Sequence, residues 1–330
     1  MSLSASAALS GIFIKILGRL GTVDHPVERS SHAKPTLRGG GIAVMITVLL
    51  MWPIGEFMVF DSMYDNGAII VALAIISAIF FIEDYKGMPI TLRLGAQIII
   101  TLLTLLAMGA GSDGGFLVFQ GFLPPVLDLF VSWMVWVWFI NLFNFMDGID
   151  GISAAQSITV TIGIVVVTTV SGLAQETMLP AILVAGAMAG FAYWNLPPAK
   201  VFLGDVGSIP LGFIIGWTLL NLAADGLWVA ALILPLYYLV DATTTLIKRI
   251  LRGERFWHAH RDHFYQMAVI NGRSHGLVSL MVFIIGLMLI SLALLSLEHP
   301  WLALLVASLE IIIFLIFLSG KFGKNPSFSK

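Results

Sequence analysis

Long apolar runs recur along the whole 330-residue chain, and they constrain its fold more than any other feature. A helix needs about 20 apolar residues to cross the roughly 30 Å hydrocarbon layer of a membrane, and about 17 can suffice. Hydrophobic residues make up 58% of the chain and charged residues 11%, whereas soluble domains contain roughly 25% charged residues. A soluble fold cannot bury this much apolar surface. We therefore predict an all-α, polytopic membrane protein.

Eleven apolar runs are candidates for membrane-spanning helices. The first is the weakest, because Lys15 and Arg19 interrupt it. No small-residue cleavage site is evident near it, so we expect an uncleaved start-anchor rather than a signal peptide. The predicted spans are approximately Leu3–Leu20, Gly41–Phe60, Gly67–Ile82, Leu94–Met108, Leu127–Ile140, Ile152–Val170, Leu179–Tyr193, Ile209–Leu222, Leu227–Thr245, Leu277–Leu297 and Trp301–Leu318.

The basic residues predict the orientation of these spans. With eleven crossings, all 17 Lys and Arg residues fall in or beside connections on one side, while the opposite loops hold acids such as Asp113 and Glu298. Lys and Arg concentrate in the cytoplasmic loops of membrane proteins. We therefore expect the basic side to be cytoplasmic, with the N-terminus outside and the C-terminus inside. No internal repeat or soluble segment is visible, so we predict a single domain over residues 1–330.

Chemistry is expected on the basic side, where polar residues gather in five clusters. The first runs from Asp24 to Gly41, contains Lys34 and Arg38, and ends in three glycines before a predicted helix. Free N–H groups at such a helix start suit an anion, but an ordinary basic loop explains the segment equally well. The second is the acid pair Glu83-Asp84 at the inner end of the third span. In isolation, this pair is better explained as solvated residues at the membrane surface.

The third cluster combines amides, acids and glycines at the end of the fifth predicted span. If that helix continues to Asp147, then Asn141, Asn144 and Asp147 share one face. Their oxygens are ligands of the kind that Mg²⁺ prefers. Gly148 and Gly151 would let the backbone turn and a ligand come close. Two Asp-Gly pairs exceed what helix capping requires, so we favour a functional interpretation.

The fourth cluster places Asp205 between glycines, in Phe-Leu-Gly-Asp-Val-Gly-Ser immediately before the eighth span. An isolated acid at a membrane edge is costly unless it binds a cation or a partner. Asp205 is therefore the first candidate for a direct metal ligand.

The fifth cluster, residues 252–266, contains His258, His260, Arg261 and His263. Arginine beside histidine suggests phosphate binding, and arginine can hold phosphate with two hydrogen bonds. The histidine spacing would also suit zinc, but the arginines favour pyrophosphate. Oxygen ligands for a metal and cations for phosphate, gathered on one face of a membrane protein, indicate phosphoryl transfer between a soluble nucleotide and a membrane-borne acceptor. The chain has no cysteine, which excludes thiolate metal sites and cysteine nucleophiles.

The order of the five motifs resembles the polyprenyl-phosphate N-acetylhexosamine-1-phosphate transferases of glycosyltransferase family 4. These enzymes transfer a sugar 1-phosphate from a UDP-sugar to undecaprenyl phosphate and release UMP. The resemblance covers nearly the whole chain. It implies Mg²⁺ as the cofactor, with Mn²⁺ as a substitute, and a UDP-N-acetylhexosamine, undecaprenyl phosphate and the lipid of a bacterial inner membrane as partners. It implies no nucleic acid, and no oligomeric state follows from the sequence.

The resemblance also implies roles for individual residues, position by position. The metal would be bound by Asp205, with Asn144 and Asp147 near it. Phe202 would stack on uracil, and Asp150 would contact the edge of that base. The pyrophosphate would be held by His260, Arg261 and His263. The remaining candidates are substrate-binding Lys34, Arg38 and Asn144, and catalytic Asp84, Glu83 and Asp147, with Glu83 standing where the family usually has Asp.

The attacking group would be a phosphate monoester, whose second pKa of about 6 leaves it mostly dianionic near neutrality. We therefore expect direct in-line attack, with Asp84 orienting or deprotonating the lipid phosphate. A covalent aspartyl-phosphate intermediate is the alternative.

Two departures bear on the subfamily. The muramoyl-pentapeptide branch has a lysine where this chain has Gly87, and three consecutive histidines where it has His-Arg-Asp-His. The pattern is more similar to transferases that initiate O-antigen or other surface glycans. The muramoyl-pentapeptide transferase remains the alternative. A secondary transporter would place acids near the membrane midplane, where Glu310 is the only acid that we identify, and it has no obvious basic partner. A non-catalytic scaffold would not need the acid clusters.

Overall fold

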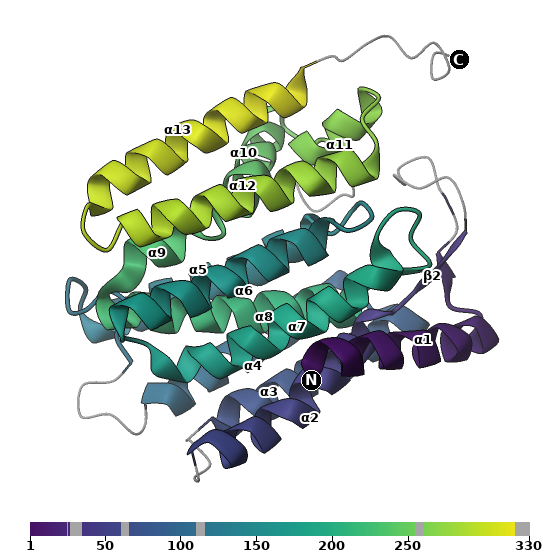
Figure 1. Cartoon of the computed structure of the whole chain (residues 1–330), viewed down its shortest axis with the longest axis horizontal. Coiled ribbons are helices and arrows are strands. Elements are labelled where there is room, and N and C mark those ends of the chain that lie inside the picture. The colour runs from purple at the N-terminus through teal and green to yellow at the C-terminus, as the bar shows by residue number, and fades with distance from the viewer. Residues whose placement is uncertain (25, 27–34, 61–65, 110–115, 255–259, 321–330) are drawn as a thin grey trace.

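The computed structural model describes the chain except residues 25, 27–34, 61–65, 110–115, 255–259 and 321–330. It is a bundle of long helices with a small sheet at one end (Figure 1). The long helices are α1 (Ser2–Leu20), α2 (Gly41–Phe60), α3 (Gly67–Lys86), α4 (Ile90–Gly109), α5 (Pro125–Phe145), α6 (Ile152–Ser171), α7 (Met178–Asn195), α8 (Asp205–Leu222), α10 (Leu236–Leu251), α12 (His275–Leu295) and α13 (Pro300–Ser319). The short elements are helices α9 (Trp228–Ile233) and α11 (Phe264–Ile270), the 3₁₀ turn Gln175–Thr177, the π turn Ala223–Leu227, and strands β1 (Val23–Asp24), β2 (Thr36–Arg38) and β3 (Val201–Phe202).

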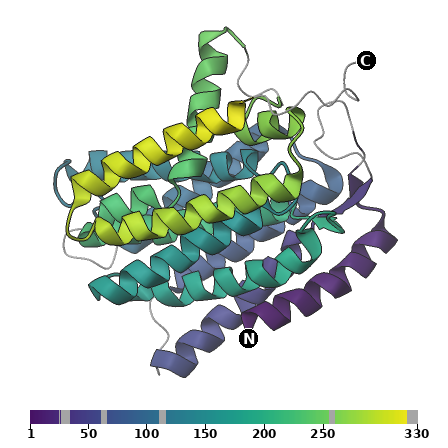
Figure 2. The same cartoon turned by 45° about the horizontal axis from the view of Figure 1, so that its top comes forward.

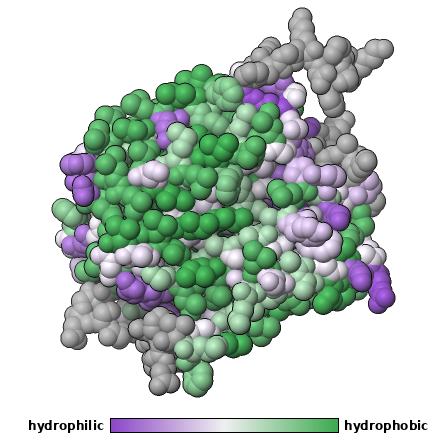
Figure 3. All heavy atoms as spheres, viewed as in Figure 1, coloured by the Kyte–Doolittle hydropathy of each residue, from purple (hydrophilic) through white to green (hydrophobic). Residues whose placement is uncertain are grey.

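Ten helical segments of the described chain are long and apolar enough to cross a membrane, one of them joining α8 to α9. Hydrophobic residues cover most of the face seen in Figure 3. Large apolar side chains such as Leu305 and Ile313 are more than half exposed on it or on other faces, as expected where lipid is the solvent. The chain is thus a predominantly helical, multi-pass membrane protein, as predicted.

The helix ends that carry the polar clusters meet at one end of the bundle, which we call the polar end. There the sheet joins the α1–α2 connection to the segment before α8. Asp150, just before α6, lies against His275 at the start of α12. At the opposite end, Gln120 before α5 donates a hydrogen bond to the carbonyl of Ala223, which follows α8. Successive helices therefore alternate in direction.

The ninth predicted span is the one that the structure changes. Instead of one helix over Leu227–Thr245, α9 ends at Ile233 and α10 begins at Leu236. Pro235 lies between them, and a proline has no N–H with which to continue a helix. The green helix that projects from the bundle in Figure 2 is α10. Because α8 ends far from the polar end and α12 begins there, α9 and α10 together return the chain. The prediction of one continuous helix is therefore wrong, and ten segments of the described chain, rather than eleven, are long and apolar enough to cross a membrane.

The first predicted span forms helix α1, although it is the weakest candidate. One face of α1 packs on α7, where the Ser6 hydroxyl donates a hydrogen bond to the carbonyl of Ala187 at 2.7 Å. A Cβ on Gly190 of α7 would lie 2.2 Å from the carbonyl oxygen of Leu3. Small residues therefore allow the two backbones to approach closely, which favours helix association in lipid.

Helix α8 lies at the centre of the bundle, and every one of its residues is buried. It contacts α2, α3, α5, α6 and α7. Glycines make this possible: a Cβ on Gly212 would lie 2.9 Å from the Ile140 Cα, and one on Gly216 would lie 2.7 Å from the Trp136 ring. The first residue of α8, Asp205, is therefore placed by packing on several sides.

The sheet fixes the entrance of α2 against the entrance of α8. Strands β1 and β2 pair antiparallel, and β2 pairs parallel with β3, with Arg38 opposite Phe202. Gly40 and Gly41 donate their N–H groups to the carbonyls of Phe202 and Leu203 at 2.9 and 2.8 Å. The expectation that these two N–H groups are free for an anion is therefore wrong. The glycines are needed for packing, since a Cβ on Gly41 would lie 2.3 Å from the Gly207 Cα.

Candidate active site

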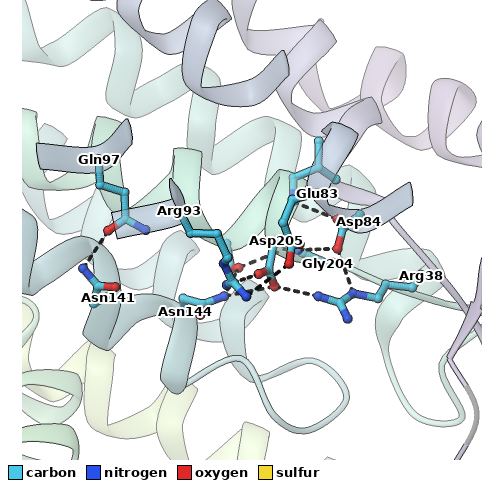
Figure 4. Close-up of polar contacts among 11 residues, drawn as sticks. Arg38, Glu83, Asp84, Arg93, Gln97, Asn141, Asn144, Gly204 and Asp205 are labelled. Atoms are coloured by element: carbon cyan, nitrogen blue, oxygen red, sulfur yellow. Dashed lines mark hydrogen bonds and ion pairs between the residues drawn. The ribbon is translucent and has the colours of Figure 1, made fainter. Parts of the chain in front are cut away.

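Three carboxylates meet at the polar end (Figure 4). Glu83 and Asp84 come from the last turn of α3, and Asp205 comes from the first turn of α8. One oxygen of each carboxylate lies within 4.8 Å of the others. Glu83 and Asp205 are buried. The second and fourth sequence clusters thus form one site, which we call the acid site, and Glu83 and Asp84 are part of it rather than isolated surface residues.

Two arginines neutralise part of the acid site. Arg38 places its Nε 2.8 Å from Asp84 Oδ1 and its Nη2 2.8 Å from Asp205 Oδ1. Arg93, at the start of α4, pairs with Glu83 at 3.1 Å and also with Asp205 Oδ2. Although burial disfavours its charge, Asp205 and Asp84 raise the pKa of Arg38 above its ordinary value. Two cations face three carboxylates, so the fully ionised cluster has a formal net negative charge.

Asp84 also orders the backbone at the start of α8. Its oxygens accept hydrogen bonds from the N–H groups of Asp205 and Val206 at 3.1 and 2.9 Å. These N–H groups have no partner within the helix and carry its positive dipole, so a carboxylate is favoured there. A Cβ on Gly204 would lie 2.5 Å from Asp84 Oδ2. The glycine before Asp205 therefore leaves room for Asp84 to reach the helix.

The third sequence cluster contributes Asn144 to the acid site. The Asn144 side chain donates hydrogen bonds to Asp205 Oδ1 at 3.2 Å and to the Ser208 hydroxyl at 2.9 Å. Asn141, one turn deeper, instead donates to Gln97 Oε1 at 2.6 Å. Helix α5 ends at Phe145, so the condition that it continues to Asp147 is not met.

Asp147 lies outside the group of three carboxylates. Its Oδ1 accepts a hydrogen bond from the Ser153 hydroxyl at 2.6 Å. Burial raises the pKa of Asp147 to about 7, the charge of Asp205 adds to this rise, and the Ser153 hydrogen bond opposes it. Near neutrality Asp147 is therefore poised between its neutral and charged forms, unlike a carboxylate fixed in an ion pair.

The acid site fits a divalent metal ion. Its three carboxylates are hard oxygen donors, which Mg²⁺ prefers. Glu83 Oε2 is buried and has no hydrogen-bond partner among the described residues. A buried carboxylate oxygen is costly without a partner, and a cation would supply one. Glu83, Asp84 and Asp205 are the residues that can hold the ion.

The two residues expected at the uracil meet at the connection between α7 and α8. Phe202 lies within this connection, and Asp150 bonds to it from the segment before α6. Phe202 lies in β3 and is partly exposed. Asp150 Oδ2 accepts a hydrogen bond from the Ala199 N–H at 3.1 Å, and its Oδ1 lies 3.3 Å from His275 Nδ1. Asp150 therefore also fixes three connections to one another. Lys34, the other expected contact from the first cluster, is outside the described residues.

His260, Arg261 and His263, which we call the His group, lie just before α11. His263 is buried, with Nδ1 3.2 Å from Asp241 Oδ1. The His260 ring is 5.0 Å from the His263 ring. Burial, followed by the nearby His263 and Arg249, lowers the pKa of His260 to about 4. His260 is therefore neutral at pH 7, and Arg261 is the permanent cation of the group. His258 lies outside the described residues.

The His group is attached to the end of α5. The Tyr265 hydroxyl donates a hydrogen bond to the carbonyl of Phe145 at 3.0 Å. A Cβ on Gly148 would lie 2.2 Å from that hydroxyl, so Gly148 admits Tyr265 rather than a ligand, whereas Gly151 has the positive φ expected of a turn. Asn144 contacts the acid site and its neighbour Phe145 contacts Tyr265. The two groups thus lie on either side of the end of α5.

Two contributors escaped the sequence analysis. Arg93 received no role, although a basic residue in the first turn of the next predicted helix was a usable signal. Asp241 was missed, and the expectation that Glu310 is the only acid deep within a span is wrong, because Asp241 and Asp128 are also fully buried in helices. An acid inside an apolar run was the signal for Asp241, since it is costly there unless it is bonded.

Comparison with known proteins agrees with the geometry. Residues 67–223 match the model of glycosyl transferase family 4. The chain is 26% identical over 327 residues to a probable undecaprenyl-phosphate N-acetylglucosaminyl 1-phosphate transferase of Bacillus subtilis, covering 94% of this chain and 88% of the relative. It is 30% identical over 223 residues to a decaprenyl-phosphate N-acetylglucosaminephosphotransferase of Mycolicibacterium smegmatis, covering 62% and 54% of the two chains. A phospho-N-acetylmuramoyl-pentapeptide-transferase of Streptococcus pneumoniae is 26% identical over 280 residues, covering 79% and 82%. The matched region contains the three acids, Asn144 and the buried helix α8, and the chain belongs to glycosyl transferase family 4.

Proposed function

We propose that this protein transfers N-acetylhexosamine 1-phosphate from a UDP-sugar to undecaprenyl phosphate and releases UMP. The observation that carries the proposal is the acid site itself, in which three carboxylates and two arginines meet at the membrane edge beside the His group. The names of the relatives support a polyprenyl phosphate as acceptor. The apolar exterior keeps such an acceptor at hand, because its long tail dissolves in the same lipid as the helices.

The difficulty of the reaction is to bring two phosphate groups together. Mg²⁺ at the acid site, or Mn²⁺ in its place, would supply positive charge for this purpose. Arg38 and Arg93 each already engage two carboxylates, and the same guanidinium groups can grip phosphate oxygens with paired hydrogen bonds. The His group, with Arg261 as its permanent charge, would hold the pyrophosphate of the donor. Phe202 and Asp150 would hold the uracil.

The acceptor phosphate is mostly dianionic at neutral pH, so a strong base adds little. We therefore assign Asp84 the task of orienting the acceptor, in addition to fixing the backbone of Asp205. Asp147, with its raised pKa, is a carboxyl suited to hold or release a proton near pH 7. Positioning and charge neutralisation supply most of the catalysis in this account.

We further propose that the polar end faces the cytoplasm across a bacterial inner membrane, with the whole of residues 1–330 acting as one transferase. The support is the segregation of basic residues, of which Arg38, Arg93 and Lys200 lie at the polar end. A cytoplasmic site would meet the soluble nucleotide sugar where cells make it.

The proposed role is the initiation of O-antigen or another surface glycan. Gly87 and the His-Arg-Asp-His sequence differ from the muramoyl-pentapeptide branch, and a site without contacts to a peptide gains no binding energy from it. The relatives include both N-acetylglucosamine and muramoyl-pentapeptide transferases. The donor therefore has to be tested directly.

The test is to incubate purified protein with undecaprenyl phosphate and a panel of UDP-sugars, and to measure UMP. We expect release with a simple UDP-N-acetylhexosamine and none with UDP-N-acetylmuramoyl-pentapeptide. Activity with the pentapeptide donor alone would assign the chain to cell-wall precursor synthesis. Uptake of a solute into proteoliposomes without any UMP release would indicate a transporter.

Replacing Asp205 by Asn tests the acid site. The substitution keeps the size of the side chain but removes a charge from the proposed metal site. We expect UMP release to fall on the order of a hundredfold or more, because a lost metal ligand costs several kcal/mol in the transition state. Glu310→Gln, within α13, is the control and should leave turnover nearly intact. Normal activity of Asp205→Asn at low Mg²⁺ would refute the metal assignment.

A further inference from the structure

One buried carboxylate, Asp241 of α10, organises the whole segment that carries the His group. It has no exposed surface. Its Oδ1 lies 3.2 Å from His263 Nδ1 and accepts a hydrogen bond from the Phe264 N–H at 3.0 Å, while its Oδ2 accepts from the Tyr265 N–H at 3.3 Å. The Tyr237 hydroxyl donates to Oδ2 at 3.2 Å. Backbone and hydroxyl donors thus surround the carboxylate.

This arrangement determines which nitrogen of His263 carries hydrogen. Ionised Asp241 can only accept hydrogen bonds, so the nitrogen that faces it, Nδ1, has to be the donor. Nε2 is then the ring nitrogen left for any ligand. Fixing an imidazole in one tautomer and one orientation through a buried carboxylate is a general means of making it useful.

The rest of α10 holds the same segment from its other side. Arg249, two turns after Asp241, pairs with Asp262 and lies 2.8 Å from Glu254. Helix α10 therefore contacts the chain on both sides of the His group. Arg249 meets Glu254 before the group, and Asp241 bonds Phe264 and Tyr265 after it. The break at Pro235 is what directs α10 toward this loop instead of continuing the line of α9.

We propose that Asp241 is a positioning residue that holds His263 in its Nδ1–H form, with Nε2 directed to the phosphates of the donor. The function of His263 in this statement rests on the proposed function. The tautomer and the orientation do not, and they can be measured separately.

The chain offers a matched control in Asp128. This second buried carboxylate also accepts two backbone N–H bonds, from Val118 at 3.0 Å and Phe119 at 2.9 Å, and a Ser132 hydroxyl bond at 3.2 Å. It lies in the first turn of α5, at the end of the bundle away from the acid site. Asp128→Asn therefore reproduces the structural damage of Asp241→Asn without touching a histidine.

The experiment compares full-length wild type, Asp241→Asn, Asp128→Asn, His263→Gln and the double variant Asp241→Asn/His263→Gln in lipid nanodiscs. The ¹⁵N spectra of histidine-labelled protein report the tautomer, with the His263 signals identified by their loss in His263→Gln. Kinetics with undecaprenyl phosphate and an active UDP-sugar report kcat and KM.

We expect Nδ1–H at His263 in wild type and Asp128→Asn, and loss of that tautomer in Asp241→Asn. We also expect kcat of Asp241→Asn to fall about 10- to 100-fold with little change in KM, the range typical of groups that orient a functional imidazole. In the His263→Gln background the same change should add little further loss. An unaltered His263 spectrum in Asp241→Asn, or an equal further loss without His263, would overturn the proposal. A wild type inactive on every UDP-sugar would refute the proposed function, while the spectra would still decide the role of Asp241.

Discussion

The ionisable residues around the site are of two kinds: those whose charge is balanced by an ion pair, and those whose neutral form is favoured by burial. Asp205 pairs with both Arg38 and Arg93, so each of these charges is compensated. For His260 and Asp147 burial outweighs the partners that favour the charged form, Asp262 and Ser153 respectively, so their neutral forms are favoured. The first kind is suited to binding charged ligands, and the second kind should respond to pH in ways that can be measured.

The pH dependence of stability should report His260. Its pKa is about 4 in the folded protein, below the roughly 6.5 of an unfolded chain, because burial and nearby cations oppose its charge. Between these values the unfolded chain binds more protons, so stability rises with pH over this window and falls as the pH drops from 6.5 toward 4. We expect His260→Gln to flatten that fall in thermal unfolding followed in nanodiscs. Parallel curves for wild type and variant would contradict the pKa.

Sequence could identify most residues of the site but not their partners. Glu83, Asp84, Asn144 and Asp205 were all selected from motifs, and the structure brings them together. Which residues meet depends on helix contacts between distant segments. That is why Asn141 was expected beside Asn144 at a ligand, although it bonds Gln97, and why Asp241 was overlooked.

At the scale of helices and strands, the decisive contacts are made by glycines where two backbones touch. Gly41 and Gly207 lie at the starts of α2 and α8, and each would push a Cβ into the other helix. The sheet beside them fixes the same two helix starts. This junction of the starts of α2 and α8 determines the geometry of the acid site, because Arg38 precedes α2 and Asp205 begins α8.

Gly41→Ala should therefore damage the site without changing any charged group. Its Cβ would meet the Gly207 Cα at 2.3 Å, a backbone atom that cannot rotate away. Such overpacking costs about 1–3 kcal/mol, so we expect a lower midpoint of thermal unfolding and reduced UMP release.

Gly18→Ala is the matched control for this substitution. Gly18 lies in α1 with nothing within 4 Å of its added Cβ. We expect it to be neutral or to stabilise by up to about 1 kcal/mol through helix propensity. If Gly41→Ala behaved like Gly18→Ala, the junction would be looser than the structure shows.

The elements themselves followed from apolar runs, except where a local break mattered. The run Leu227–Thr245 is apolar enough to read as one helix, and Pro235 within it was not taken as an end. Prolines also occur inside α2 and α8 without breaking them. Sequence alone does not distinguish these cases, because neighbouring helices decide whether a freed carbonyl finds another partner.

Across the whole molecule, the segregation of charge and the alternation of helices agree. Eleven passages were predicted from the requirement that the basic residues share a side, and the structure places the corresponding helix ends together. The three-dimensional neighbours were not predictable, since α8 contacts helices from both earlier and adjacent parts of the chain. Apolar runs and charge segregation predict which segments cross the membrane but not their packing order.

The orientation of the bundle is open to a direct test, because the chain has no cysteine. We expect single cysteines at exposed Lys86 and Lys200 to be protected from an impermeant thiol reagent in intact cells, and one at exposed Glu298 to react. After the cells are opened, all three should react. Labelling of Lys86→Cys and Glu298→Cys from the same side would break the predicted topology.

The fully buried position of α8 has a consequence for how the protein is made. Helices enter a membrane in the order of synthesis, and α8 follows α2, α3, α5, α6 and α7, all of which it contacts. We therefore expect these earlier helices to close around α8 only after it has been synthesised. Closing the bundle around it brings Asp205 to Asp84 and β3 to β2 in one event. We therefore expect the acid site to form only when α8 assembles with the earlier helices. A nascent chain released before α8 would lack Asp205 and therefore the acid site.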